Sequence, residues 1–368
     1  MAFFLIVAYV LLILCNFLLA YSGKKNWIIA YITFGIILFV FFVNGEDFIR
    51  QIYDLSNYRA QYNYYDPFLD PTFSSYYLFF IVMKLGQSSG MDFIDWWHCL
   101  MIFSNIIIIC ALKIHKFNPH WFLFFYTIYY LFVLYTGLKF YLGFSVFLLG
   151  MGFLLKGGRY NKCAFGIATC IAGGFHVMYY LFLIFLFVNT SKSLEDCKNN
   201  LVKSICFIGV ILSIVVRFTG TANRLIGGMA SVFDNEKFNS YIELSTNGGF
   251  YIAIIMQLLS MYCAYKYMRS MQEYYPLEYQ IQGETLFFIN YLQVLFYPFF
   301  MISTTFMRLL TVSSFVTITA CGKEAEKLFL GTRQQLIFYS LLVIFGFYIR
   351  QFIIGDLWET SVLPFFLP

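Results

Sequence analysis

Three polar side chains stand in apolar surroundings, where burying a charge costs several kcal/mol. Lys139 follows a Thr-Gly-Leu turn, His176 follows Gly-Gly-Phe, and Arg308 opens an apolar run. Lys139 either snorkels to lipid headgroups or holds a phosphate at the mouth of a cavity. His176 either hydrogen-bonds to backbone carbonyls freed by the glycine break or titrates near neutral pH. Arg308 requires a partner or a ligand, so these residue types point to anion binding and proton transfer.

A second polar group fills residues 44–71, between two apolar runs. It carries the acids Asp47 and Asp70, together with Tyr53 and the tyrosine-rich run 58–65. Aromatic faces can pack against the C–H faces of sugars, and carboxylates can accept hydrogen bonds from sugar hydroxyls. The stretch therefore suits a glycan-binding surface. The alternative is an aromatic belt at the membrane interface with solvated acids.

The motifs of soluble enzymes and of metal sites are missing from the sequence. No phosphate-binding P-loop, no dinucleotide-binding glycine motif, no H-E-x-x-H and no G-x-S-x-G occurs, so no nucleotide cofactor is expected. The nine cysteines show no C-x-x-C spacing and predict neither a disulfide framework nor a metal site. The net charge of +5 arises in loops and indicates no nucleic-acid partner.

The elements that must position these groups are membrane helices. Hydrophobic residues make up 61% of the chain and charged residues 12%, against about 25% charged in soluble domains. Apolar runs recur along the chain, and no period-2 alternation marks a barrel. We expect an all-α, polytopic membrane protein with about 10–12 transmembrane helices, forming a single integral membrane domain over residues 1–368. The clearest spans are 2–21, 27–43, 93–112, 121–137, 139–155, 201–219, 250–266, 285–303, 306–321 and 334–353.

Basic residues predict the orientation of the spans, because lysine and arginine mark cytoplasmic loops. All the basic clusters can face the cytoplasm if segment 72–88 does not cross the membrane and segment 163–188 enters and returns on one side. The N-terminus and two long loops, 44–71 and 220–249, then face outward. The clusters are Lys24-Lys25, Lys113/Lys116, Lys156/Arg159/Lys162, Lys192/Lys198/Lys203, Lys266/Arg269 and Lys323/Lys327/Arg333.

Arginine concentrates on the predicted outer side, where Arg59, Arg217, Arg224 and Arg308 all fall. The planar guanidinium binds phosphate and carboxylate through two parallel hydrogen bonds. These arginines therefore either bind an anionic ligand or pair with the acids of the outward loops.

The order of these features resembles the EpsG-like branch of the O-antigen and capsular polysaccharide polymerases, the Wzy group. The resemblance covers residues 1–190 well and residues 285–321 loosely. The residues that carry it are Gly45-Glu46-Asp47, Tyr53, Asp70-Pro71-Thr72-Phe73, Lys139, Ala172 to His176 and Arg308. The chain departs from the family pattern in three ways. Lys139 replaces an arginine, Asp70 replaces a glutamate, and the arginine before the Gly-x-Asp motif is absent.

The resemblance implies a glycosyltransferase in the bacterial cytoplasmic (inner) membrane, acting at its outer face. A glycan carried on polyprenyl diphosphate would be passed to a hydroxyl of the next lipid-linked repeat unit. The implied partners are these lipid-linked oligosaccharides, membrane lipid and a chain-length regulator protein, and no cofactor or metal is implied.

The resemblance also implies roles for particular residues. Asp47 or His176 would act on the acceptor hydroxyl as the catalytic base. The cations that would hold the leaving diphosphate are Lys139, Arg308, Arg224 and Arg217. Further contacts with the substrate are expected from Arg59, Tyr53 and Asp70.

Two other functions stay open on the sequence. A polysaccharide flippase or transporter commonly shows internal repeats and about twelve to fourteen spans, and no repeat is visible here. A membrane acyltransferase that modifies glycans would need a catalytic histidine, and His176 is a candidate for that role. The lipid-linked product in a deletion strain separates the three, because a missing polymerase leaves single repeat units exposed outside.

Overall fold

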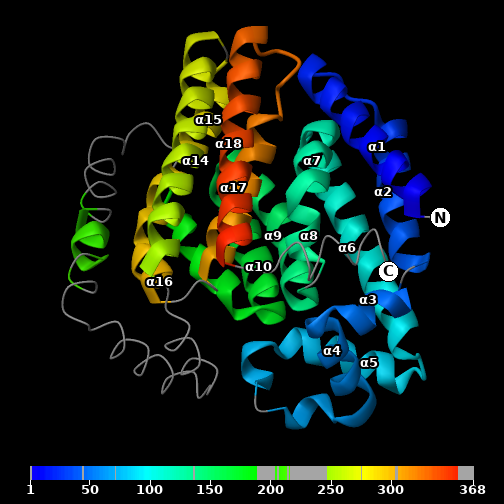
Figure 1. Cartoon of the computed structure of the whole chain (residues 1–368). Helices are drawn as coiled ribbons and strands as arrows, with labels where there is room; N and C mark the ends of the chain where they lie inside the picture. Colours follow the sequence, from blue (N-terminus) through cyan, green and yellow to red (C-terminus); the bar gives the residue numbers. More distant parts are fainter. Residues whose placement is uncertain are drawn as a thin grey trace.

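The computed structural model describes residues 2–188, 204–215 and 247–354, apart from 44, 71, 136, 205–206, 214, 275 and 303–305. All the regular elements in this part of the chain are helices, which confirms the predicted all-α class (Figure 1). Arg217, Arg224 and residues 220–246 of the loop predicted to face outward lie outside the described residues.

Two helices open the chain and form a hairpin. α1 (Ala2–Ser22) and α2 (Trp27–Val43) are joined by a turn in which Gly23 has a φ of +75°. The amide of Asn16 on α1 donates to the Thr33 hydroxyl on α2 at 3.1 Å. This buried hydrogen bond ties the two helices together at one level.

Long helices and several short ones form the body of the molecule, and two of the long helices occupy its centre. α9 (Leu138–Lys156) is buried along most of its length, and every residue of α17 (Met307–Cys321) is buried except Arg308. The other body helices are α6 (Phe93–Ile114), α7 (Pro119–Phe125), η3 (Tyr126–Tyr130), α8 (Leu131–Leu134), α10 (Arg159–Phe175), α14 (Asn247–Tyr274), α15 (Leu277–Leu292), η6 (Gln293–Phe296), α16 (Tyr297–Ile302) and α18 (Leu330–Ile354).

Three of the described helices are long and apolar enough to cross a membrane, namely Phe93–Ile114, Leu138–Lys156 and Leu330–Ile349. α2 together with α3 (Gly45–Gln51) makes a fourth if this bent pair is one span. Shorter apolar helices add to these. The polytopic class is therefore confirmed, while the number of 10–12 spans stays a prediction.

The segment around His176 is a hairpin of two arms. α10 ends at Phe175, and η4 (Val177–Phe187), a 3-10 helix, runs back beside it. The Lys162 ammonium, near the start of α10, donates to the carbonyl of Leu186 at the end of η4 over 3.5 Å. The two ends of the hairpin thus lie together at one end of the bundle, and the cytoplasmic orientation of this end stays a prediction.

A cap of short helices covers the other end of the bundle (Figure 1). It consists of α3, α4 (Tyr53–Tyr64), η1 (Pro67–Leu69), η2 (Phe73–Ser75) and α5 (Tyr77–Ser88). The twelve residues of α5 rise only about 18 Å, less than the ~30 Å of a hydrocarbon core. The α5 helix is therefore too short to span the hydrocarbon core by itself, and the position of segment 72–88 relative to the membrane stays a prediction.

The basic turns gather at the end opposite the cap. Lys25 pairs with Glu326 at 3.6 Å and donates to the carbonyl of Lys116 at 3.3 Å. Lys139 and Lys156 lie at the two ends of α9, about 26 Å apart along the helix. That separation is close to one hydrocarbon thickness. The cap and the basic turns therefore lie at opposite ends of the bundle, and the outward orientation of the cap stays a prediction.

Candidate functional site

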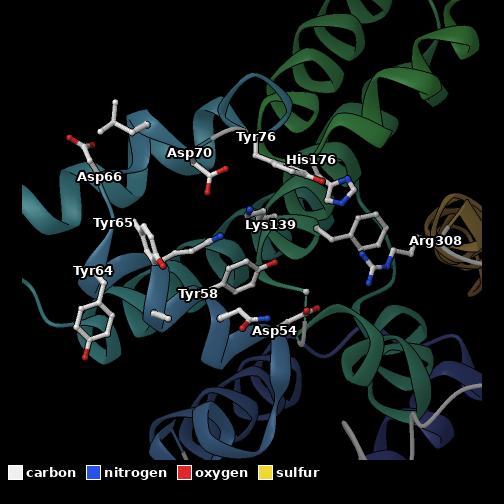
Figure 2. Close-up of a pocket in the computed structure, with 16 residues that line it drawn as sticks. Asp54, Tyr58, Tyr64, Tyr65, Asp66, Asp70, Tyr76, Lys139, His176 and Arg308 are labelled. Atoms are coloured by element: carbon white, nitrogen blue, oxygen red, sulfur yellow. The ribbon is translucent and has the colours of Figure 1, made fainter. Parts of the chain in front are cut away.

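A cavity of about 960 Å³ lies between the cap and the body of the molecule. Its walls come from α4, from the turns on either side of η1, and from the start of α9, the α10–η4 break and the start of α17 (Figure 2). Its charged and titratable lining side chains are Asp54, Asp66, Asp70, Lys139, His176, Arg308 and the tyrosines Tyr58, Tyr64, Tyr65 and Tyr76.

Lys139 enters the cavity from the first turn of α9. Its side chain is only 5% exposed, so its ammonium is enclosed by protein and does not extend into lipid. The ammonium nitrogen lies 4.2 Å from the ring centroid of Tyr76, 4.6 Å from Phe80, 4.9 Å from Phe79 and 5.3 Å from Tyr58. These four rings form an aromatic cage. Their negative faces offset part of the desolvation of the charge.

Arg308 approaches the same region from the start of α17. Its guanidinium carbon lies 5.7 Å from the ring centroid of Phe140, the residue after Lys139. The His176 ring also contacts Phe140, with ring centroids 5.3 Å apart. Phe140 therefore contacts both Arg308 and His176 at the start of α9.

The N-terminus of α9 adds a further site for an anion. Gly137 is its N-cap residue and supplies no side-chain hydrogen bond to the first turn. The first amides of a helix lack partners within the helix, and the helix dipole favours a negative charge there. Lys139, Arg308 and these amides together give a cationic end to the cavity that suits a phosphate or diphosphate.

His176 is fixed by its own backbone. Its Nδ1 accepts a hydrogen bond from the Met178 amide at 3.4 Å, and its ring meets those of Tyr76 and Phe140 edge to face at 5.3 Å each. With Nδ1 acting as acceptor, the neutral ring carries its proton on Nε2. His176 is then suited to donate a hydrogen bond through Nε2 rather than to remove a proton.

The carboxylates along the cavity differ in how they are engaged. Asp70 accepts from the amide and the hydroxyl of Thr72 at 2.7 and 2.6 Å. Asp66 pairs with Lys84 at 3.2 Å. The hydrogen bond from the Phe68 amide and then the bond from Lys84 lower the pKa of the Asp66 carboxyl.

Asp54 is the third carboxylate, and among the described residues it forms neither a hydrogen bond nor an ion pair. It stands in the first turn of α4, four residues before Tyr58. Burial raises the pKa of the Tyr58 hydroxyl, the charge of Asp54 raises it further, and the charge of Arg308 lowers it. Asp54 and Arg308 thus both act on the electrostatics of the Tyr58 hydroxyl, and all three residues line the cavity.

Four of the residues singled out in the sequence meet at this cavity: Lys139, Arg308, His176 and Asp70. In Figure 2, Arg308 and His176 lie at one end of the view and Tyr64, Tyr65 and Asp66 at the other, with Lys139 between them.

The remaining predicted residues lie elsewhere. Asp47, Arg59 and Tyr53 do not line the cavity. Arg59 forms a fork with Glu46, at 2.8 and 3.5 Å, and the side chain of Tyr53 is 77% exposed. Arg217 and Arg224 lie outside the described residues.

Asp54 and Tyr76 have no role assigned from the sequence, and Tyr58 enters only as part of the tyrosine-rich run 58–65. Asp54 and Tyr58 are spaced one helical turn apart, which would place them on one face of a helix had 53–64 been recognised as one. Tyr76 carried no local signal, because its role comes from a contact with Lys139 sixty-three residues away. Within the described part of the chain, no group of three His, Cys, Asp or Glu side chains is close enough to hold a metal ion.

In the comparison with protein families, residues 49–367 match the model of the EpsG family. This stretch contains every residue that lines the cavity. No curated protein and no solved structure matches the chain.

Proposed function

The chain belongs to the EpsG family, and on that premise we propose that it is a polysaccharide polymerase, a glycosyltransferase that joins oligosaccharide repeat units carried on polyprenyl diphosphate. The reaction would take place at the outer face of the bacterial cytoplasmic membrane. The cavity between the cap and the body of the molecule would be the active site.

The observation that carries this proposal is the cationic end of the cavity. Lys139 and Arg308 come from helices 169 positions apart and converge on the start of α9. Fixed cations in a site that excludes water stabilise the charge that develops on a leaving group. A diphosphate that gains negative charge as its bond to the sugar breaks is such a group.

The opposite end of the cavity has the residue types that a glycan requires. Tyr64 and Tyr65 are 81% and 65% exposed at its rim, where their rings can pack against sugar faces. Asp66 and Asp70 lie beside them and can accept hydrogen bonds from sugar hydroxyls.

In the proposed reaction each of these cavity side chains has one role. The acceptor hydroxyl oxygen attacks the anomeric carbon of the donor glycan, and the bond between that carbon and the diphosphate oxygen breaks. Asp54 takes the proton of the hydroxyl, because it is the cavity carboxylate that has no partner among the described residues. The negative charge that arrives on the diphosphate lies between Lys139 and Arg308, and His176 donates a hydrogen bond to it.

The two rival functions receive less support from this geometry. An acyltransferase would use His176 as a base, yet Nδ1 of that ring already accepts from the Met178 amide. A flippase would need the substrate to pass through the body of the molecule, whereas the cavity lies between the body and the cap.

The test is the ladder of lipid-linked glycan lengths in cells that carry Arg308→Ala. Loss of one charge-assisted contact to a leaving group is expected to cost about 3–4 kcal/mol, or roughly two to three orders of magnitude in rate. Arg308→Lys should restore part of the ladder, because a point charge replaces a fork. Arg269→Ala is the matched control, since Arg269 pairs with Glu273 at the far end of the bundle. A normal ladder for Arg308→Ala at normal protein level would show that the diphosphate binds elsewhere.

A further inference from the structure

A second hollow runs along the outer side of the α10–η4 hairpin, apart from the cavity of the proposed active site. It has a volume of about 570 Å³ and is lined by Tyr77 of α5, by one face of α10 and by Leu186 of η4. We call it the α10 groove. Apart from Arg159 and Lys162 at one end, its α10 lining is cysteine, glycine and isoleucine.

The floor of the groove is open at Gly166. A Cβ atom at that position would meet only the two methyl carbons of Leu186, at 3.7 and 3.9 Å, which is ordinary contact. Ile167 and Ile171 rise beside it and are 63% and 41% exposed. From Arg159 to Ile171 the helix advances about 18 Å. That length is close to one leaflet of a hydrocarbon core, which is about 15 Å thick.

The basic end of the groove supplies a place for a headgroup. Arg159 and Lys162 lie three residues apart in the first turn of α10 and so share a face. Arg159 is exposed, and Lys162 reaches the Leu186 carbonyl across the end of the groove. This end lies on the side of the bundle where the basic turns gather, which is the predicted cytoplasmic face and therefore the face of the anionic leaflet.

We propose that the α10 groove binds one anionic phospholipid of the cytoplasmic leaflet. Its phosphodiester lies on Arg159 and Lys162, and one acyl chain follows α10 over Gly166 toward Tyr77. Both parts of the groove are then used, because the cations match the phosphate and the apolar floor matches the chain. A polyprenyl diphosphate held by Lys139 fits less well, since its charge would lie at the opposite end of the hairpin.

Such a lipid would stabilise the hairpin that carries His176. It would contact α10, η4 and α5 together. The end of α10, the start of η4 and the start of α5 meet beside the active-site cavity. This inference does not depend on the proposed reaction.

The experiment measures the melting temperature of the purified full-length chain in neutral detergent, with phosphatidylglycerol or phosphatidylcholine of identical acyl chains. Phosphatidylglycerol should raise the melting temperature of the wild type by about 2–4 °C relative to phosphatidylcholine. The double variant Arg159→Gln with Lys162→Gln should lose this difference. Gly166→Leu should lose it as well, because it fills the floor while both cations remain.

Matched controls separate the groove from general effects of charge and of added bulk. Lys113→Gln with Lys116→Gln removes two cations from another turn at the same end, and Gly35→Leu adds the same side chain where nothing lies within 4 Å. Both should keep the full difference.

Three results would overturn the proposal. The first is an undiminished difference in one of the groove variants. In the Arg159 and Lys162 double variant it would place the lipid elsewhere, and in Gly166→Leu it would show that only the headgroup, and no acyl chain, is bound here. The second is an equal rise with inorganic phosphate, which would indicate an anion site without a chain. The third is a rise with polyprenyl phosphate and none with phosphatidylglycerol, which would assign the groove to the substrate.

Discussion

At the scale of single residues, the surroundings of Lys139 show how a buried cation is stabilised in an apolar protein. A Lys side chain that is 5% exposed has lost most of its hydration. Four rings within 5.3 Å of its ammonium replace part of that hydration and fix the charge at the wall of the cavity. The cage therefore positions the cation as well as tolerating it.

Replacing the nearest ring tests this positioning role. Tyr76→Leu removes the face 4.2 Å from the ammonium and should lower the rate of chain extension about 5- to 30-fold, the equivalent of roughly 1–2 kcal/mol. Tyr76→Phe keeps the ring and should retain most of the rate. The measurement is the glycan ladder at matched protein level. Equal ladders for the two variants would mean that the cage does not act through Lys139.

The identity of the base gives a second prediction at this scale. Asp54→Asn should reduce chain extension by about 10²- to 10⁴-fold, the range for loss of a general base, while Asp47→Asn should leave most of it. The reason is that Asp54 lines the cavity and Asp47 does not. The same ladder assay ranks the two variants. The opposite ranking would restore Asp47, one of the two bases that the family resemblance implies, and would remove Asp54 from the mechanism.

At the scale of elements, the sequence predicted two helices closely, because an uninterrupted apolar run sets the length of each. The expected spans 27–43 and 139–155 correspond to α2 and α9 within one residue at each end. The expected spans 121–137 and 285–303, by contrast, are each divided among several helices. The helices of the cap were not predicted individually. α4 is polar and strongly aromatic, and its helical state depends on packing of Leu55 and Tyr62 against the body rather than on any pattern along the chain.

The five-residue π-helical stretch η3 is a further feature that the sequence did not predict. It interrupts the expected span 121–137 at Tyr126–Tyr130. The Tyr130 ring stacks on Phe315 of α17 with centroids 3.9 Å apart and an interplanar angle of 8°. A contact between residues so distant in sequence leaves no periodic signal, so only the folded structure reveals it.

Close packing of the hairpin against α9 gives the prediction at this scale. A Cβ atom on Gly143 would lie 2.4 Å from the ring of Tyr179 and 3.2 Å from the carbonyl of Ala172. Gly143→Val should therefore push η4 outward, destabilise the fold by about 1–3 kcal/mol and displace His176. The expected result is a lower melting temperature together with a shortened ladder. Gly35→Val, in open space on α2, is the control, and an unchanged melting temperature for Gly143→Val would contradict this account of the packing.

At the scale of the whole molecule, the distribution of charged residues along the sequence predicted which of them would lie at the same end of the helix bundle. Four candidate residues distributed from Asp70 to Arg308 come together at one cavity, because each stands at a boundary between an apolar run and a polar turn. Arg59 and Tyr53 show the limit of this reasoning. A loop that folds into helices directs some side chains inward and others outward, and the sequence of a polar loop does not say which.

The orientation of this assembly in the membrane gives the last prediction. Tyr64 in the cap is 81% exposed, and Tyr160 at the start of α10 is 91% exposed, so a cysteine at either position would be open to solvent. The two lie at opposite ends of the bundle, with the cap predicted to be outside and the basic turn inside. In a background without the nine native cysteines, Tyr64→Cys should react with a membrane-impermeant maleimide in intact cells. Tyr160→Cys should react only after permeabilisation. The reverse pattern would place the cavity on the cytoplasmic face, where a polymerase of exported repeat units could not use it, and would refute the proposed function together with the topology.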